Sequence, residues 1–233
     1  MRIFMIVIFL AFASLKAAAG DVVIQKAQGD VRARQGVAEV WNTVSVGDVL
    51  RPNDTMKTGK RSSAVLLARV EGKPDKRISL PADVIVDISD IRELTQEELM
   101  LKLTMEKVRS SSYEWKTNEL QMPNATVVHG QDRRSTEPLS ENHTEVGMLQ
   151  WNGTRVLLDN GFYSTGVLRA MEVFRMYPGI SSAVSNRLLF AEALEKAQLR
   201  GEAVAEYGSI AGMPGLTAAQ QSHVQVRLAA LRK

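Results

Sequence analysis

Side chains that could bind a metal are few and widely spaced in this sequence. The chain of 233 residues has no cysteine, and its histidines are His129, His143 and His223. Two histidines 14 residues apart, without cysteines or a pattern of flanking carboxylates, do not match the spacing of zinc ligands. We therefore expect all three histidines to lie on the surface, and we predict no metal site.

Motifs for catalysis are also missing from the sequence. It contains no Gly-x-Ser-x-Gly, no phosphate-binding loop and no zinc-type His-Glu helix, and serine and histidine cluster only in the polar stretch 110–144. General acid and base chemistry needs paired groups held in a pocket. We predict that the protein is not an enzyme, with no catalytic residue, no cofactor-binding residue and no cofactor.

Aromatic and sulfur side chains offer a second kind of chemistry, which is stacking and packing. Four aromatic residues could stack on a sugar ring, and these are Trp41, Tyr113, Trp115 and Trp151. For Trp41 we favour a place in the core. Three tyrosines are expected to pack between helices, namely Tyr163, Tyr177 and Tyr207. Three methionines are expected to fill core gaps and not to bind metal, namely Met100, Met105 and Met122.

The N-terminal residues predict export. Arg2 precedes a largely apolar run at 3–15, and small residues at 17–19 suit a cleavage site before Gly20. Lys16 interrupts the run before the roughly 20 apolar residues that a membrane span needs, so a permanent anchor is the weaker alternative. We expect residues 1–19 to be a signal peptide cleaved after Ala19. Without cysteine, lipid modification of the new terminus and disulfides are both excluded.

The charge balance argues against nucleic acid as a partner. Loss of Arg2 and Lys16 with the signal peptide lowers the formal net charge from +3 to +1. The remaining lysines and arginines are dispersed, so no strong basic patch is expected. The small cluster of Lys57, Lys60 and Arg61 is interpreted as the solvated edge of a hairpin.

Residues 20–92 have the pattern of an all-β domain. Short β-branched stretches begin at Val22, Val31, Val37, Ser63, Arg77 and Val84, and turn residues such as Gly29-Asp30, Gly47-Asp48 and Thr58-Gly59 separate them. Six to eight strands at this spacing predict an antiparallel sandwich or barrel.

The same stretch resembles the FecR domain of Gram-negative cell envelopes over residues 22–91. The matching positions are Gly29, Val31, Arg34, Gly36, Trp41, Val46, Gly47, Leu50, Asp54, Thr58, Gly59, Ser63 and Ala64. The family's usual glycine before Asp54 is Asn53 here, and asparagine tolerates positive φ. Residues 122–130 match a further segment of the family more weakly, and they depart from it at Met122 and His129. The resemblance implies a periplasmic β domain. It does not imply sigma-factor regulation, since Met1 and Arg2 cannot form the cytoplasmic arm that this activity needs.

Residues 93–144 read as a connector. Thr95 and Glu98 form a capping box for a helix over 96–109, and Leu94 with Leu99 supplies a hydrophobic staple. From residue 110 to 144 the composition turns polar, and part of it is expected to be loop.

Residues 145–233 resemble tetratricopeptide repeats. The ladder runs through Leu157, Gly161, Tyr163, Gly166, Ala170, Val173 and Pro178. Small residues let paired helices approach, Gly161 makes the turn between them, and Pro178 ends the second helix. In a less regular second unit, we expect Ser181 or Ser182 to cap a helix that Gly201 breaks. Thr217 and Gln220 then begin a last helix.

These features predict an α+β protein in two parts that binds and does not catalyse. Helical repeats leave a groove that can hold another envelope protein, while the alternative is that the helices simply pack on the β domain. The second hypothesis is a glycan or peptidoglycan binder. A purely structural role also remains open.

Overall fold

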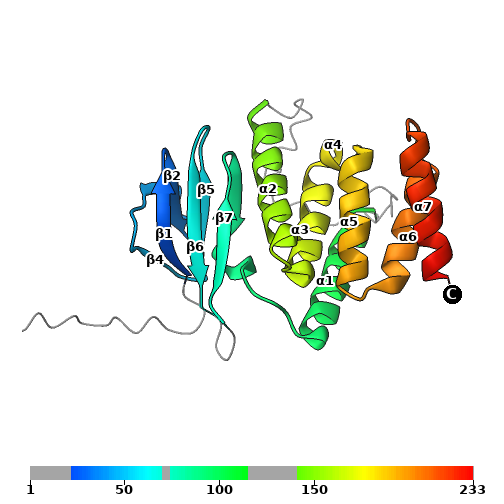
Figure 1. The fold of residues 1–233 in the computed structure, drawn as a ribbon, viewed down its shortest axis with the longest axis horizontal. Helices are drawn as coiled ribbons and strands as arrows, with labels where there is room; N and C mark the ends of the chain where they lie inside the picture. Colours follow the sequence, from blue (N-terminus) through cyan, green and yellow to red (C-terminus); the bar gives the residue numbers. More distant parts are fainter. Residues whose placement is uncertain (1–21, 70–73, 115–140, 233) are drawn as a thin grey trace, which may run out of the picture.

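The computed structural model describes residues 22–69, 74–114 and 141–232, and it confirms an α+β protein with its strands in the N-terminal half and its helices in the C-terminal half (Figure 1). The predicted signal peptide and most of the polar segment lie outside these residues. Among the described helices, none combines the length and apolar content needed to cross a bilayer.

The described strands form two antiparallel sheets of four strands each. One has the order β4-β1-β6-β7, made of Val49–Leu50, Val22–Gln28, Ser63–Ala68 and Lys76–Leu80. The other has the order β3-β2-β5-β8, made of Asn42–Thr43, Val31–Gln35, Asp54–Thr58 and Val84–Asp87. The two sheets stay separate, so the barrel alternative is wrong.

Alternation along the strands builds the core between the sheets. Val84 and Val86 are buried while Ile85 and Asp87 are partly exposed, as the sequence pattern predicts. Both sheets contribute to one apolar cluster through buried residues such as Ile24, Leu66 and Ile78 from the first and Val31, Met56 and Val84 from the second. The predicted strand at Val37 and Val40 is wrong, because these side chains are 98% and 67% exposed in a loop between β2 and β3.

Two details of the β half differ from the sequence prediction. The alternation at Val84, Val86 and Ile88 predicts one strand, but Ile88 is buried at the start of a 3-10 helix, Ile88–Asp90, and does not continue β8. Beside Asn53, the positive φ of 53° belongs to Gly36, whose N–H donates to the Asn53 carbonyl at 2.7 Å. The residue of this turn in the left-handed conformation is therefore Gly36, which adopts it without strain, and not Asn53.

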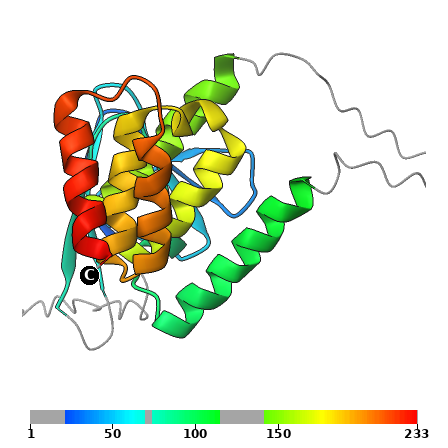
Figure 2. The same cartoon turned by 90° about the vertical axis from the view of Figure 1, so that its right-hand side faces the viewer.

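The helices run α1 Gln96–Glu114, α2 Glu141–Asp159, α3 Tyr163–Met176, α4 Pro178–Ser181, α5 Val184–Lys196, α6 Arg200–Ala211 and α7 Ala218–Leu231. Thr95 caps α1 as predicted, since its hydroxyl accepts the Glu98 N–H at 3.2 Å. The reciprocal half of the predicted capping box is not formed, because the Glu98 carboxylate binds Arg92 and Lys102 instead. Helix α1 packs on α3 through buried Leu99 and Leu103, and Figure 2 shows it crossing beside the row formed by the other helices.

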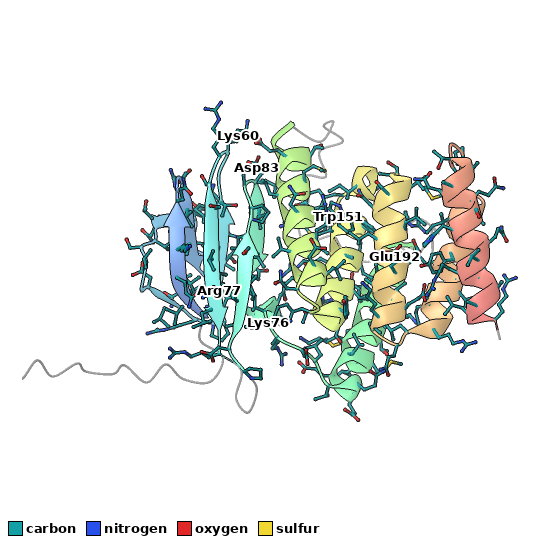
Figure 3. The ribbon with its side chains drawn as sticks, viewed as in Figure 1. Lys60, Lys76, Arg77, Asp83, Trp151 and Glu192 are labelled. Atoms are coloured by element: carbon teal, nitrogen blue, oxygen red, sulfur yellow. The ribbon has the colours of Figure 1, made fainter. Side chains whose placement is uncertain are left out.

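Helix α2 belongs to both halves of the molecule. One side carries Val156 and Leu157 into the core of the sandwich, and the other carries Trp151 and Leu158 into the helical core. Along its length α2 covers β7 and β8, which are the edge strands of the two sheets on this side (Figure 3). The first helix of the C-terminal half therefore packs directly on the β half.

Hydrogen bonds hold α2 against this edge at two levels. Past the middle of the helix, the Asn152 amide donates to the Asp83 carbonyl at 2.8 Å. Just after its last residue, the Lys76 ammonium donates to the Asn160 carbonyl and lies 4.2 Å from the centre of the Phe162 ring. Because the contacts come from β7 and from the turn before β8, they fix α2 along both edge strands.

The hairpins α2–α3 and α5–α6 are two copies of one structural unit. After α2, Gly161 has a φ of 77°, and the Phe162 N–H donates to the Leu157 carbonyl at 3.0 Å. After α5, Gln198 has a φ of 62°, and the Leu199 N–H donates to the Leu194 carbonyl at 2.9 Å. Both turns are Schellman motifs, and Gln198 follows Gly161 by 37 residues.

The same offset of 37 residues relates the buried positions of the two hairpins. Equivalent buried pairs are Thr154 and Ala191, Leu157 and Leu194, Phe162 and Leu199, Gly166 and Ala203, Ala170 and Tyr207, and Val173 and Ile210. A further step of 37 from Ala191 and Leu194 leads to Leu228 and Leu231 of α7, which pack in the same helical core. Helix α7 thus occupies the position of the first helix in a third unit.

In the first unit the predicted turn at Gly161 and the close approach at Gly166 are confirmed, while α3 ends at Met176 and Pro178 is the first residue of α4. Predictions for the second unit need correction. A β-carbon at Gly166 would lie 2.4 Å from Leu158 Cδ2, so this glycine does permit close helix packing. Gly201 lies inside α6 and does not break a helix, because Gln198 makes the turn. Ser181 and Ser182 do not cap α5, since their hydroxyls donate back to carbonyls at 178 and 179. Thr217 and Gln220 form the predicted capping box of α7.

Candidate functional site

The first helices of the three units, α2, α5 and α7, line one face of the helical half. Between α2 and α5 this face has a hollow of about 190 Å³, with Leu158, Asp159, Leu189, Glu192 and Lys196 among its lining residues. The Lys196 ammonium lies 5.0 Å from the centre of the Tyr163 ring, which also lines the hollow. Apolar and charged groups therefore meet in one depression.

A second hollow, of about 450 Å³, continues this face between α5 and α7. It is lined by Glu192, Glu195, Lys196, His223 and Arg227, so it shares Glu192 and Lys196 with the first hollow. The His223 Nε2 atom lies 3.3 Å from a Glu192 carboxylate oxygen across this space. Figure 3 marks Glu192 on α5, and this residue lines both hollows. The two depressions form a continuous surface across three helices, here called the α2/α5/α7 face.

The floor of the second hollow is a hydrogen-bonded set of polar groups, of which Tyr207 is buried while Glu195 and Arg227 are partly exposed. The Tyr207 hydroxyl donates to Glu195 at 2.7 Å, and Arg227 Nε donates to the same carboxylate at 2.9 Å. Burial opposes ionisation of Glu195, but the hydrogen bonds from Arg227 and Tyr207 outweigh it and lower the pKa of this carboxyl. Burial and the neighbouring carboxylate raise the pKa of Tyr207. At neutral pH Glu195 is therefore an anion, and Arg227 is the cation bound to it.

A third cavity, of about 340 Å³, lies between α1 and α3 and is mainly a charged junction. Arg169 of α3 binds Asp87, Asp90 and Glu172, with 2.9 Å from its Nε to Asp90. Burial raises the pKa of Asp90, although Arg169 opposes the shift, and the surrounding carboxylates raise the pKa of Arg169 against its own burial. We interpret this network as the contact that joins η1 to α3, because each ionised group in it already has a partner.

The aromatic residues predicted to stack on sugars occupy different environments. Trp151 is 1% exposed and stacks on Phe174 at a centroid distance of 5.1 Å, so it is a core residue and no glycan can reach it. Trp41 is only partly buried and lies outside the core clusters, so its predicted core position is wrong. The Tyr113 side chain and all of Trp115 lie outside the described residues.

Two of the packing predictions are confirmed and two are wrong. Tyr177 and Tyr207 are buried between helices, as expected, while Tyr163 is half-buried at the edge of the first hollow. Met100 and Met105 are 47% and 49% exposed, because α1 turns Leu99 and Leu103 toward α3 and leaves the methionines outside. Met122 falls outside the described residues.

The histidines do not assemble a metal site in the described part of the chain. No group of three or more histidine, cysteine or acidic residues in that part has the geometry to hold a metal ion. His223 is partly exposed beside Glu192 on the second hollow. His129 and the His143 side chain lie outside the described residues.

Sequence reasoning missed the residues of the α2/α5/α7 face. Glu192, Lys196 and Arg227 look like ordinary polar residues of amphipathic helices, and no local motif distinguishes them. The repeat of 37 residues was the available signal, since it aligns α2, α5 and α7 and so identifies which helices share a face.

We compared the chain with known protein families, with curated proteins and with solved structures, and none of the three comparisons found a match.

Proposed function

We propose that this protein is an exported, non-catalytic component of the bacterial cell envelope that binds a protein partner on its α2/α5/α7 face. The observation that carries the proposal is the pair of adjoining hollows that share Glu192 and Lys196. Stacked helical hairpins offer extended surfaces of this kind to polypeptide ligands.

The chemistry of the face suits a polypeptide with mixed charge. Asp159 and Glu192 supply acceptors, Lys196 and Arg227 supply donors, and apolar Leu189 lines the first hollow. A bound segment could bury apolar side chains against Leu189 while pairing its own charges with both signs. The Glu195 carboxylate on the floor is already paired with Arg227 before binding. The site therefore needs no rearrangement of its floor to accept a ligand.

The FecR-like and tetratricopeptide-like assignments are part of this proposal. The FecR-like positions Gly29, Gly36, Gly47 and Gly59 lie in turns of the β half, and three of them have positive φ. The Schellman turns and the offset of 37 residues support a repeat made of helical hairpins. Export rests on the N-terminal sequence, which has a charged start, an apolar run and small residues before Gly20.

Site-specific photo-crosslinking in intact cells tests the binding face. A photo-reactive residue placed at position 192, on the half-exposed Glu192 site, should capture a specific protein. The same residue at position 77, on exposed Arg77 of β7, is the matched control and should not capture that protein. Lys196→Glu should abolish the crosslink, whereas Lys60→Glu in the exposed β5–β6 turn should leave it intact.

Two results would contradict the proposal. Equal capture from positions 192 and 77 would show that the helical face has no special role in binding. Fractionation that recovers the full-length polypeptide in the cytosol with residues 1–19 still attached would contradict export.

A further inference from the structure

The outer face of the second sheet carries two cations that meet at one aromatic ring. Arg34 of β2 follows buried Ala33, and Lys57 of β5 lies between buried Met56 and Thr58, so both half-buried side chains point away from the core. The Arg34 guanidinium lies 4.9 Å and the Lys57 ammonium 4.8 Å from the centre of the Trp41 ring. Both distances are within the range of cation–π contacts.

Neither cation has an acidic partner among the described residues. Arg32, the neighbouring cation on this face, is ion-paired with Asp30 at 2.6 Å, but no carboxylate lies within salt-bridge distance of Arg34 or Lys57 in the described part of the chain. The Nε atom of Arg34 is buried and lacks a hydrogen-bond acceptor. A guanidinium with an unused buried donor is costly unless an acceptor is supplied from elsewhere.

The indole ring holds these cations and is not an open platform for a sugar. With two charges already within 5 Å of its centre, its π system is engaged. The backbone offers no alternative recognition, because β2 pairs with β3 and β5 on its two sides and β5 pairs with β2 and β8. A ligand on this face must therefore be recognised through the charged side chains.

We propose that Arg34 and Lys57, held in place by Trp41, form a binding site for an oxyanion group of an anionic ligand. The planar guanidinium donates two parallel hydrogen bonds to a carboxylate or phosphate, and the ammonium adds a point charge. Arg34 also lines a hollow of about 390 Å³ at the β3–β4 side of the sandwich, but this hollow holds the carboxylates of Asp48 and Asp54 and is not lined by Trp41 or Lys57. The oxyanion site is therefore the outer-face position beside Trp41 and not this hollow. The site is separate from the α2/α5/α7 face and does not depend on the proposed protein binding.

Calorimetric titration of the purified protein tests the site and identifies the oxyanion. The probes are inorganic pyrophosphate for phosphate, a galacturonic acid oligomer for carboxylate on a glycan, and a neutral glucose oligomer of equal length. We expect one or both anions to bind and the neutral oligomer not to bind. Binding of pyrophosphate alone would assign a phosphate site, and tighter binding of the uronate would assign an acidic glycan.

Variants connect the binding to the named residues. Arg34→Gln and Lys57→Gln should each weaken binding by roughly tenfold or more, since each removes a charge-assisted contact. Lys60→Gln makes the same change of charge in the exposed β5–β6 turn and should weaken binding by less than about twofold. Arg34→Lys keeps the charge but loses the planar pair of donors, so it should still fold and bind more weakly.

The outcomes that would overturn the site are equally specific. Failure of both anions to bind at about 10 mM, where even a weak site of millimolar affinity would be occupied, rejects it. Equal losses in Lys60→Gln and Lys57→Gln would indicate diffuse attraction without a site. Thermal melting of each variant separates loss of folding from loss of binding, and Lys57→Gln remains informative if Arg34→Gln does not fold.

Discussion

Gly153 of α2 lies directly against Ile85 of β8. A β-carbon built on Gly153 would stand 1.8 Å from the Ile85 carbonyl oxygen, closer than any side-chain atom can approach a backbone atom. This contact explains how the helix reaches the strand edge. It also makes position 153 the most sensitive point of the junction between the two halves.

Gly153→Ala should therefore destabilise the protein. The gain in helix propensity is about 1 kcal/mol, but the clash with the β8 backbone costs more, and we expect a net loss of about 1–3 kcal/mol in the free energy of unfolding. Chemical denaturation measures it. The matched control is Gly208→Ala in α6, where nothing lies within 4 Å of the added carbon and stability should rise by about 0.5–1 kcal/mol. A Gly153→Ala protein as stable as the parent would contradict the close approach of α2 to β8.

Replacement of Arg169 should destabilise the protein, because it leaves the carboxylates around it without their cation. Arg169→Met leaves Asp87, Asp90 and Glu172 without their common cation, and the expected loss is about 3–5 kcal/mol at neutral pH. Arg77→Met, at an exposed arginine of β7, should change stability by less than about 0.5 kcal/mol.

The loss of stability in Arg169→Met should become smaller as the pH falls. Burial already raises the pKa of Asp90 above 3.8, and removal of the opposing guanidinium raises it further. A carboxyl with a raised pKa in the folded state stabilises that state while it is protonated, and this contribution is lost as the pH rises through the folded pKa. Unfolding curves from pH 4 to 7 should therefore show the variant recovering part of its stability at the acidic end. A deficit independent of pH would assign the loss to packing instead.

Substitutions at the left-handed residues of the two Schellman turns should have opposite effects on stability. Gln198→Gly removes the β-carbon from a residue in the left-handed conformation, and it should stabilise the protein by about 0.5–1 kcal/mol. Gly161→Ala introduces the same penalty in the first unit and should cost about 1 kcal/mol. Thermal melting of both variants measures the pair. Effects of the same sign at the two positions would mean that the turns are not equivalent.

Trp151 should behave as a packing residue. Trp151→Ala removes a ring that stacks on Phe174 in the helical core, and the expected loss is about 3–5 kcal/mol. Trp151→Phe keeps an aromatic ring and should cost less. Denaturation curves test the order of the two variants. Loss of glycan binding by Trp151→Ala without any loss of stability would contradict its burial.

Local patterns in the sequence predicted the parts of the fold that depend on local chemistry. Alternation at Val84 and Val86, the caps at Thr95 and Thr217, and the turn at Gly161 are all set by neighbouring residues, and the structure confirms them. The predicted break at Gly201 was wrong because the turn is made by Gln198 in the left-handed conformation, which a glutamine in the sequence does not indicate.

Features that depend on contacts across the chain could not be predicted in this way. The outward position of Met100 and Met105 follows from which side of α1 meets α3. The α2/α5/α7 face likewise requires residues from three helices, and its members Glu192 and Arg227 are 35 positions apart in the sequence. Neither arrangement is indicated by any short stretch of the sequence.

The shared helix α2 also has a consequence for folding. The last described strand ends at Asp87, but the helix that covers the β7 and β8 edge begins at Glu141 and ends at Asp159. A chain in which α2 has not yet docked carries an uncovered strand edge, and open edges of this kind readily pair with strands of other chains. Conditions that detach α2 from the β half should therefore promote aggregation.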